Sequence, residues 1–304
     1  MKRLVLAAWA AAVLVGATLA GCGGSAAADG GSGNTPPAYT AFAEPATVMI
    51  TGYPGDAMEP FISKDGLYLF FNSRNDPSVD TDLFYATRVD DLTFAFRGAV
   101  AGANSAALDA VASLDALGNF YFVSTRSYAT TLTTIYSGAW SASGLGSVAP
   151  VAGVSLQQAG SVNFDAEISA DGSTLWFDDG RFAASGVLQA ASLAVASRRG
   201  AAFVRQADSA VVLASVNASG LNYAPSISVD GLELFFTRVD STTSGALPAI
   251  YRSTRADTGS PFAMPAVVAA ATGFVEAPSL SGDGHLLYFH KLVGARYVIQ
   301  CARR

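Results

Sequence analysis

The chain has 304 residues, of which 51% are hydrophobic and 14% charged, and its 24 acidic residues outnumber 18 basic ones. This acidic balance argues against nucleic-acid binding, which usually leaves a basic footprint on the sequence. With only two histidines and two cysteines, neither a histidine-based catalytic triad nor a disulfide framework is expected.

The first 21 residues predict a secretion signal. A basic start and an apolar stretch precede Leu19 to Cys22, which reads Leu-Ala-Gly-Cys and resembles a bacterial lipobox. The apolar stretch is too short to span a membrane. We therefore expect residues 1–21 to be removed and Cys22 to carry a lipid. The alternative is a plain signal peptide whose cleavage site happens to contain a cysteine.

Residues 22–38 are mostly small and polar, so they predict a flexible tether and not part of a core. The expected location is therefore the cell envelope, with a lipid-anchored domain at the outer membrane that faces the periplasm or the cell surface. The lipid is the only membrane contact expected. With Cys22 lipidated, Cys301 would be the one free thiol.

A motif of the form Ser-x-Asp-Gly recurs along the remaining chain. Four clear copies occupy residues 63–66, 169–172, 228–231 and 281–284. A degenerate fifth copy starts at Ser113, where a longer turn through Asn119 replaces the tight one. The five serines are 50, 56, 59 and 53 residues apart. A period in this range indicates a repeat architecture.

Each repeat expands into four strands. After the Asp-Gly turn, which favours a hairpin, comes a strand that is apolar on both faces, at 67–71, 120–123, 175–177, 232–236 and 286–289. A third strand follows a variable loop, as in 82–88, and a weaker fourth strand follows that, as in 94–100 and 262–268. Four antiparallel strands per unit, with sheets stacked face to face, are typical of a β-propeller blade.

The two ends of the chain complement each other. The last repeat stops after its third strand, at Arg304, whereas residues 42–48 match the fourth strand at 262–268 in five of seven positions. An N-terminal strand that completes the last blade would close the ring and remove exposed sheet edges. Residues 39–304 then give five blades of about 53 residues each, within the propeller range. The predicted fold class is all-β, a five-bladed β-propeller of four-stranded antiparallel blades closed by an N-terminal strand.

The Ser-x-Asp-Gly turn, the aromatic strand, the arginine that follows it and a third strand such as Asp82-Leu83-Phe84-Tyr85 together resemble the TolB-type, WD-like β-propeller repeats of bacterial envelope proteins. The resemblance covers essentially the whole mature chain. It implies a propeller fold and a role in binding other molecules. It transfers no catalytic residue, because the shared motif residues mainly build blades.

Charged residues recur at both ends of one hairpin in each repeat. Antiparallel pairing places the start of the first strand and the end of the second at one rim of the disc. The rim residues are Glu59, Asp109, Asp165, Glu167, Glu276, Arg74, Arg126, Arg181, Arg238 and Lys291. Either they pair between blades and cement the ring, or some face the channel and bind a polar ligand. We expect Arg74 to cement its blade through Glu59, the acid at the matching rim position.

An acidic loop holds Asp76, Asp80 and Asp82, which could offer oxygens to a calcium ion. A solvated loop is the favoured interpretation. We therefore predict no metal site, and no cofactor is expected.

Two functions remain open. The favoured prediction is a monomeric, non-catalytic envelope scaffold that binds a protein, peptide or glycan, and hence not an enzyme. The alternative is a carbohydrate-active enzyme, because five-bladed propellers include glycoside hydrolases with carboxylates around the channel mouth. Such an enzyme needs carboxylates with distinct protonation behaviour. Glu59, Asp109, Asp165 and Glu167 could supply them, although the first three each have an arginine in the same repeat that could neutralise them.

Overall fold

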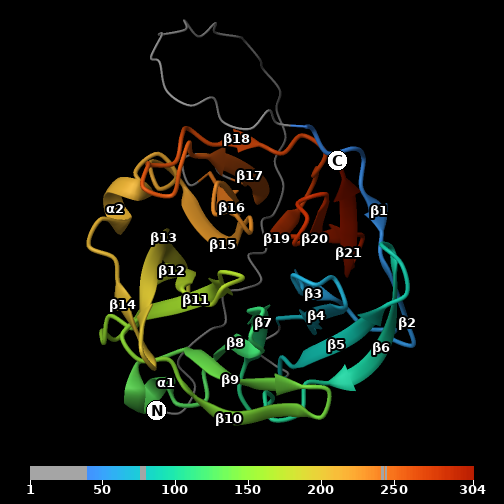
Figure 1. Ribbon diagram of the computed structural model, residues 1–304, viewed down its shortest axis with the longest axis horizontal. Coiled ribbons are helices and arrows are strands. Elements are labelled where there is room, and N and C mark those ends of the chain that lie inside the picture. Colours follow the sequence, from blue (N-terminus) through green and yellow to red (C-terminus); the bar gives the residue numbers. More distant parts are fainter. Residues whose placement is uncertain (1–39, 76–79, 241–242, 244) are drawn as a thin grey trace, which may run out of the picture.

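The computed structural model describes residues 40–75, 80–240, 243 and 245–304. Five antiparallel sheets stand around a central axis, as Figure 1 shows. The predicted five-bladed β-propeller is therefore confirmed. The expected signal peptide, the tether and Cys22 lie outside the described residues, so they remain predictions.

The first three blades follow the chain from the centre outward. Blade 1 contains β3 (Met58–Ile62), β4 (Tyr68–Asn72), β5 (Leu83–Arg88) and β6 (Thr93–Ala99). Blade 2 contains β7 (Asp109–Leu114), β8 (Asn119–Ser124), β9 (Ile135–Ser141) and β10 (Gly144–Pro150). Blade 3 contains β11 (Ser161–Ile168), β12 (Thr174–Phe182), β13 (Leu188–Arg199) and β14 (Ala202–Arg205).

The last two blades keep the same order, and the two one-turn helices of the described residues lie at the outside of the disc (Figure 1). Blade 4 contains β15 (Leu221–Ile227), β16 (Glu233–Val239), β17 (Ala249–Thr254) and β18 (Ala266–Val267). Blade 5 contains β19 (Val275–Leu280), β20 (Leu286–Val293) and β21 (Arg296–Arg303). The helices are α1 (Tyr128–Thr131) and α2 (Ser209–Val212).

The second strands supply the packing between blades. Phe70 and Phe71 on β4 are both fully buried, one on each face of the sheet. The Phe70 ring lies 5.0 Å from the ring of Phe120 in blade 2, in an edge-to-face arrangement. A strand apolar at successive positions is covered on both faces, as the sequence predicted.

The N-terminal segment closes the ring. β1 (Ala46–Thr47) pairs antiparallel with β21 and becomes the fourth strand of blade 5. The chain then continues into β2 (Met49–Thr51), which pairs in parallel with β6 of blade 1. The sequence predicted the first pairing and not the second. Figure 1 shows β1 and β2 along the outer edges of these two neighbouring blades, which the segment therefore ties together.

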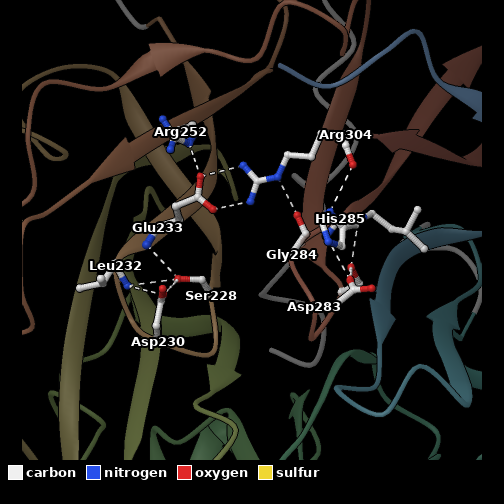
Figure 2. Close-up of polar contacts among 11 residues, drawn as sticks. Ser228, Asp230, Leu232, Glu233, Arg252, Asp283, Gly284, His285 and Arg304 are labelled. Carbon is white, nitrogen blue, oxygen red and sulfur yellow. Dashed lines mark hydrogen bonds and ion pairs between the residues drawn. The ribbon is translucent and has the colours of Figure 1, made fainter. Parts of the chain in front are cut away.

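The Ser-x-Asp-Gly turn is a self-contained hydrogen-bonded unit. Ser63 Oγ donates to Asp65 Oδ1 (2.5 Å) and accepts the backbone N–H of Tyr68 (2.9 Å), while Gly66 takes a φ of +73°, which residues with a Cβ rarely adopt. Figure 2 shows the same arrangement at Ser228 and Asp230. These turns line one face of the disc, which we call the turn face.

Blade 2 departs from the predicted repeat alignment by two residues. Asp115 occupies the position of the turn serines, since its N–H bonds to Asn119 O as Ser63 N–H bonds to Tyr68 O. The Asp115 carboxylate accepts the N–H groups of Leu117 and Asn119 and so replaces both the serine and the aspartate of the usual turn. Ser113, which the repeat period suggested, lies two residues earlier, inside β7.

The second strand of blade 3 is longer than predicted. It runs through Asp178 and Asp179 to Phe182, and these acids are part of the strand and not of a loop after it. Gly180 makes this possible, because a Cβ there would come within 2.2 Å of the Phe164 ring.

Candidate functional site

A backbone bulge recurs in every inner strand, close to the central axis. The pairing register shifts in each of these strands, and one residue in each has a φ near +50°: Glu59, Val111, Asp165, Ala224 and Ala277. A positive φ is costly for a residue with a side chain and persists only where the surroundings hold it. The bulges lie toward the start of the inner strands, on the face opposite the turns. We call it the carboxylate face.

Side chains of the preceding blade hold several bulges in place. The N–H of Glu59 donates to His290 Nδ1 (3.1 Å), that of Val111 to Asn72 Oδ1 (3.2 Å), and that of Ala277 to Thr237 Oγ1 (2.9 Å). Each acceptor follows directly after the last phenylalanine of a second strand. The polar residue that ends an apolar run therefore links one blade to the next.

The bulge residues enclose a small central cavity of about 20 Å³. Glu59 of blade 1 and Asp165 of blade 3 bring carboxyls to it, and the other three bulge positions are apolar. A space of this size holds one water molecule. Burial raises the pKa of Glu59 to about 8, and the charge of Asp165 adds to the rise. Burial also raises the pKa of Asp165 to about 7.

Asp165 has a second carboxyl beside it, on the neighbouring strand of the same blade. Burial, followed by the charge of Asp165, raises the pKa of Asp178 well above its usual range. As carboxylates, Asp165 Oδ1 and both oxygens of Asp178 are buried and have no hydrogen-bond partner among the described residues. Once Asp178 is protonated, it can donate to Asp165, and this hydrogen bond favours the ionised form of Asp165.

A hydrogen-bonded chain from two further blades supports Glu59. His290 Nδ1 accepts a backbone N–H, so its proton lies on Nε2, which is 3.1 Å from Glu276 Oε2. The hydroxyl of Tyr223 donates to the other Glu276 oxygen. Glu276 thus fixes the tautomer of His290, which in turn orients the backbone of Glu59. Asn75 Nδ2 donates to Glu59 Oε1 (2.9 Å), whereas Glu59 Oε2 is buried and finds no partner in the part of the chain that the structure describes.

The arginines do not neutralise the central carboxyls. Arg74 pairs with Asp56 (2.7 Å) and not with Glu59, and it reaches the carbonyl of Ala295 in blade 5. The expected Arg74–Glu59 pair is therefore wrong. Asp56, in the loop before β3, forms the ion pair with Arg74 in place of Glu59. Arg126 does pair with the predicted Asp109 (2.7 Å).

The remaining predicted rim residues are scattered. Arg181 is exposed at the end of β12, and no ion pair of Arg181 or Lys291 is found among the described residues. Arg238 is buried and donates to Asn222 Oδ1 (2.7 Å) and to the carbonyl of Val216 (2.6 Å). The ten residues form no continuous ring of charge.

Glu167 points away from the carboxylate face. It pairs with Lys64 Nζ at 2.8 Å, and both side chains are nearly buried, at 5% and 8% exposure. Lys64 belongs to the turn of blade 1, so this ion pair crosses the channel toward the turn face. On that face Arg304 also joins blade 5 to blade 4 through Glu233 (Figure 2).

Within the described part of the chain, no three His, Cys, Asp or Glu side chains converge in a way that could ligate a metal. The acidic loop considered for calcium includes Asp76, which lies outside that part. Neither described helix is long and apolar enough to cross a membrane.

Several residues of the site were missed from the sequence alone. Asp178, His290 and Tyr223 contact the predicted acids, but they lie on different strands from them. The available signal was the polar residue directly after the last phenylalanine of the second strand, as in Phe177-Asp178 and Phe289-His290. Recognising its role requires the geometry of the neighbouring blade.

No protein-family model matches the sequence, and a comparison with characterised proteins finds no match. Solved structures do resemble the fold. A glycoside hydrolase aligns with a TM-score of 0.59 and 11% identity over 88% of this chain and 92% of that one. A family 117 glycoside hydrolase from Zobellia galactanivorans aligns with a TM-score of 0.57 and 11% identity over 87% of this chain and 90% of that one. The catalytic domain of a GH62 α-L-arabinofuranosidase from Coprinopsis cinerea aligns with a TM-score of 0.56 and 10% identity over 86% of this chain and 96% of that one.

TolB from Acinetobacter baumannii is also among the similar structures, with a TM-score of 0.46 and 13% identity over 82% of this chain. This chain spans about 55% of that TolB chain. The sequence resemblance to TolB-type repeats thus has a structural counterpart, at a level too low to support an argument about function.

At these identities the likenesses show the fold alone. They nevertheless correct one prediction. The chain was expected not to be an enzyme, but several solved structures that share its five-bladed fold are glycoside hydrolases. A non-catalytic role therefore does not follow from the architecture.

Proposed function

We propose that the chain is a carbohydrate-active enzyme that hydrolyses glycosidic bonds at the mouth of the central cavity on the carboxylate face. The observation that carries the proposal is the pair Glu59 and Asp165. The two carboxyls come from different blades, line one water-sized cavity, and have pKa values raised to about 8 and about 7. Glycoside hydrolysis requires two carboxyls of this kind in different protonation states.

No arginine of the described residues pairs with Glu59, and this supports the proposal. Arg74, the arginine of the same repeat, is engaged by Asp56. A buried carboxyl that pairs with an arginine ionises readily and cannot act as an acid near neutral pH. Glu59 instead retains its proton and can donate it.

The roles follow from the two environments. Glu59 has the higher pKa and is assigned as the general acid, which gives its proton to the glycosidic oxygen as the bond to the anomeric carbon breaks. Asp165 is assigned as the general base, which takes a proton from the water that attacks the anomeric carbon. Burial and the charge of Asp165 raise the pKa of Asp178 well above its usual range, and in its protonated form Asp178 assists by donating a hydrogen bond to the Asp165 carboxylate. Proton exchange with solvent restores the starting state.

The cavity sets a limit on how a substrate binds. At about 20 Å³ it accommodates the attacking water and not a sugar ring. The proposal therefore places the glycosidic bond at the mouth of the cavity, above the bulge residues. The envelope location and the lipid at Cys22 remain predictions from the sequence, and they would place the enzyme near polysaccharides of the cell envelope.

The experiment is hydrolysis of a panel of aryl glycosides by the purified chain and by two isosteric variants, Glu59→Gln and Asp165→Asn. We expect cleavage of at least one glycoside, and a loss of about 100-fold or more in kcat for each variant, since positioned acid–base groups contribute about 10² to 10⁴. We also expect a bell-shaped pH–rate profile with its optimum near neutral pH.

Glu44→Gln serves as the matched control, because Glu44 is exposed and lies outside the cavity. This variant should hydrolyse at the wild-type rate. Wild-type turnover in Glu59→Gln, or no cleavage of any glycoside by the wild-type chain, would rule out the proposed roles.

A further inference from the structure

A second and much larger pocket opens on the turn face, with a volume of about 610 Å³. Residues at the second position of all five turns line it: Lys64, Ala116, Ala170, Val229 and Gly282. It therefore surrounds the channel axis at the end opposite the central carboxyls. It also extends outward along the boundary between blades 1 and 2, to Tyr68 and Trp140.

Lys64 separates this pocket from the small cavity. Its ammonium group donates to Glu167 Oε1 (2.8 Å) and to the carbonyl of Leu280 (3.4 Å), so that it connects three blades. Glu167 lines the small cavity, whereas Lys64 lines the large pocket. The two sites thus adjoin at the Lys64–Glu167 ion pair, and neither Glu59 nor Asp165 lines the large pocket.

The pocket presents both acceptors and donors. Asp65 is exposed, and only its Oδ1 is engaged, by Ser63 and by the N–H of Leu67 among the described residues. Lys64, next to it in the sequence, has three N–H donors and places two of them on protein acceptors. The Asp115 carboxylate, in contrast, is satisfied by its own turn.

The outer wall is aromatic. Tyr68 and Trp140 are both half-buried, and their rings lie 5.6 Å apart at an interplanar angle of 81°. Trp140 is held by a stacked contact with Phe120 and an edge-to-face contact with Phe70. The wall is therefore held in place by ring packing, and its surface is largely apolar.

We infer that the turn-face pocket binds a neutral oligosaccharide of about two or three rings, a size that suits its volume. A metal ion or an organic cation is disfavoured because the Lys64 ammonium group would repel it. An anion is disfavoured because the Asp65 carboxylate would repel it. A ligand rich in hydroxyl groups uses donors and acceptors together, and the apolar faces of its rings suit an aromatic wall. The choice of ligand class rests on the proposed function, for which this pocket would hold a further part of a polymeric substrate.

The test is calorimetric titration of the purified chain with cellotriose, maltotriose and N-acetylchitotriose. We expect at least one of them to bind saturably. Ala116→Phe places a ring in the pocket from an exposed position, and it should weaken binding at least tenfold. Leu117→Phe is the matched control, because Leu117 is the next residue, is 78% exposed and does not line the pocket.

Leu117→Phe should bind within twofold of the wild type, and so should Glu59→Gln, whose substitution lies in the other cavity. Binding that Ala116→Phe weakens and Glu59→Gln retains, together with hydrolysis that only Glu59→Gln loses, assigns the two activities to different sites, so they can fail independently. The inference is overturned if none of the three trisaccharides binds the wild-type chain. It is also overturned if Ala116→Phe, with an unchanged melting temperature, binds as tightly as the wild type.

Discussion

Single residues decide whether a charged side chain in this propeller is structural or chemically available. Glu59 and Asp109 were predicted from the same repeat position, yet their environments differ. Asp109 accepts from Arg126 and from Ser105, so its charge is fully compensated. One carboxyl oxygen of Glu59 accepts a hydrogen bond from Asn75, and the other has no donor within residues 40–75, 80–240, 243 and 245–304. The two-residue offset of blade 2 is the cause, because it places Val111 and not Asp109 at the bulge.

Arg74 and Arg238 should differ in what their removal costs. The Arg74 side chain is 41% exposed and pairs with a partly exposed acid, an arrangement that contributes little, at most about 1 kcal/mol. Arg238 is buried, donates to two neighbours and lies 4.6 Å from the centroid of the Tyr251 ring. Without Arg238 the acceptors Asn222 Oδ1 and Val216 O lose this hydrogen-bond donor, so Arg238→Ala should destabilise the protein by about 1 to 3 kcal/mol.

Denaturant midpoints of the two alanine variants check this order. An Arg74→Ala midpoint further from the wild type than that of Arg238→Ala would contradict it.

The sequence could predict which residues recur in the repeats but not which of their side chains contact one another. The pattern identified Glu59 and Asp165 because each precedes a turn serine by four residues. It could not identify Asp56 as the partner of Arg74, because that contact depends on a loop outside the repeat. Nor could it identify the turn-face ion pair of Lys64 with Glu167, since these residues lie 103 positions apart.

At the scale of the strand, regular hydrophobic runs made the second strands predictable and irregular backbone made the inner strands hard to predict. At least three of the five bulges depend on hydrogen bonds to neighbouring blades, such as Ala277 N–H to Thr237 Oγ1. A similar set of contacts links the inner strands further along: Ser279 Oγ accepts the N–H of Ile62, and Ser113 Oγ accepts that of Ile168. Nothing local in the sequence specifies these partners.

The N-terminal segment should be essential for stability. Ala43 N–H donates to Arg303 O (2.7 Å), Val48 N–H donates to Ile299 O (2.9 Å), and Phe42 packs 5.9 Å from Phe235. Deleting residues 39–50 would expose the edge of β21 and the end of the core between blades 4 and 5. We expect a large fall in melting temperature together with aggregation.

The point variant Phe42→Ala should cost about 3 to 5 kcal/mol if the segment is fully docked. Met49→Ala is the control, because Met49 is 57% exposed and should change stability little. A melting temperature unchanged by the deletion would show that the ring does not depend on this closure.

At the scale of the whole molecule, the two ends of the channel have opposite characters. The carboxylate face gathers acids that are uncompensated by arginine around a water-sized space. The turn face holds compensated charges, such as Arg304 with Glu233 (Figure 2), and it also holds the larger pocket. This asymmetry is what makes the carboxylate face the candidate for acid–base chemistry and the turn face the candidate for binding.

The central carboxyls also make stability depend on pH in a defined direction. The pKa of Glu59 rises from 4.5 to about 8 on folding, so the folded state binds more protons than the unfolded state between these values. Stability therefore decreases as pH rises from about 4.5 to about 8, and the loss is complete above the folded pKa. Asp165 acts in the same direction, from 3.8 to about 7.

The most direct test of the account is the free energy of unfolding of the wild type and of Glu59→Gln, measured by denaturant at pH 5.5 and pH 9. Glutamine keeps the oxygen that Asn75 contacts and mimics the protonated acid. The two proteins should have similar stability at pH 5.5, and the variant should be the more stable by roughly 1 to 4 kcal/mol at pH 9. A variant less stable than the wild type at pH 9 would show that Glu59 is a compensated carboxylate, and it would contradict the central claim.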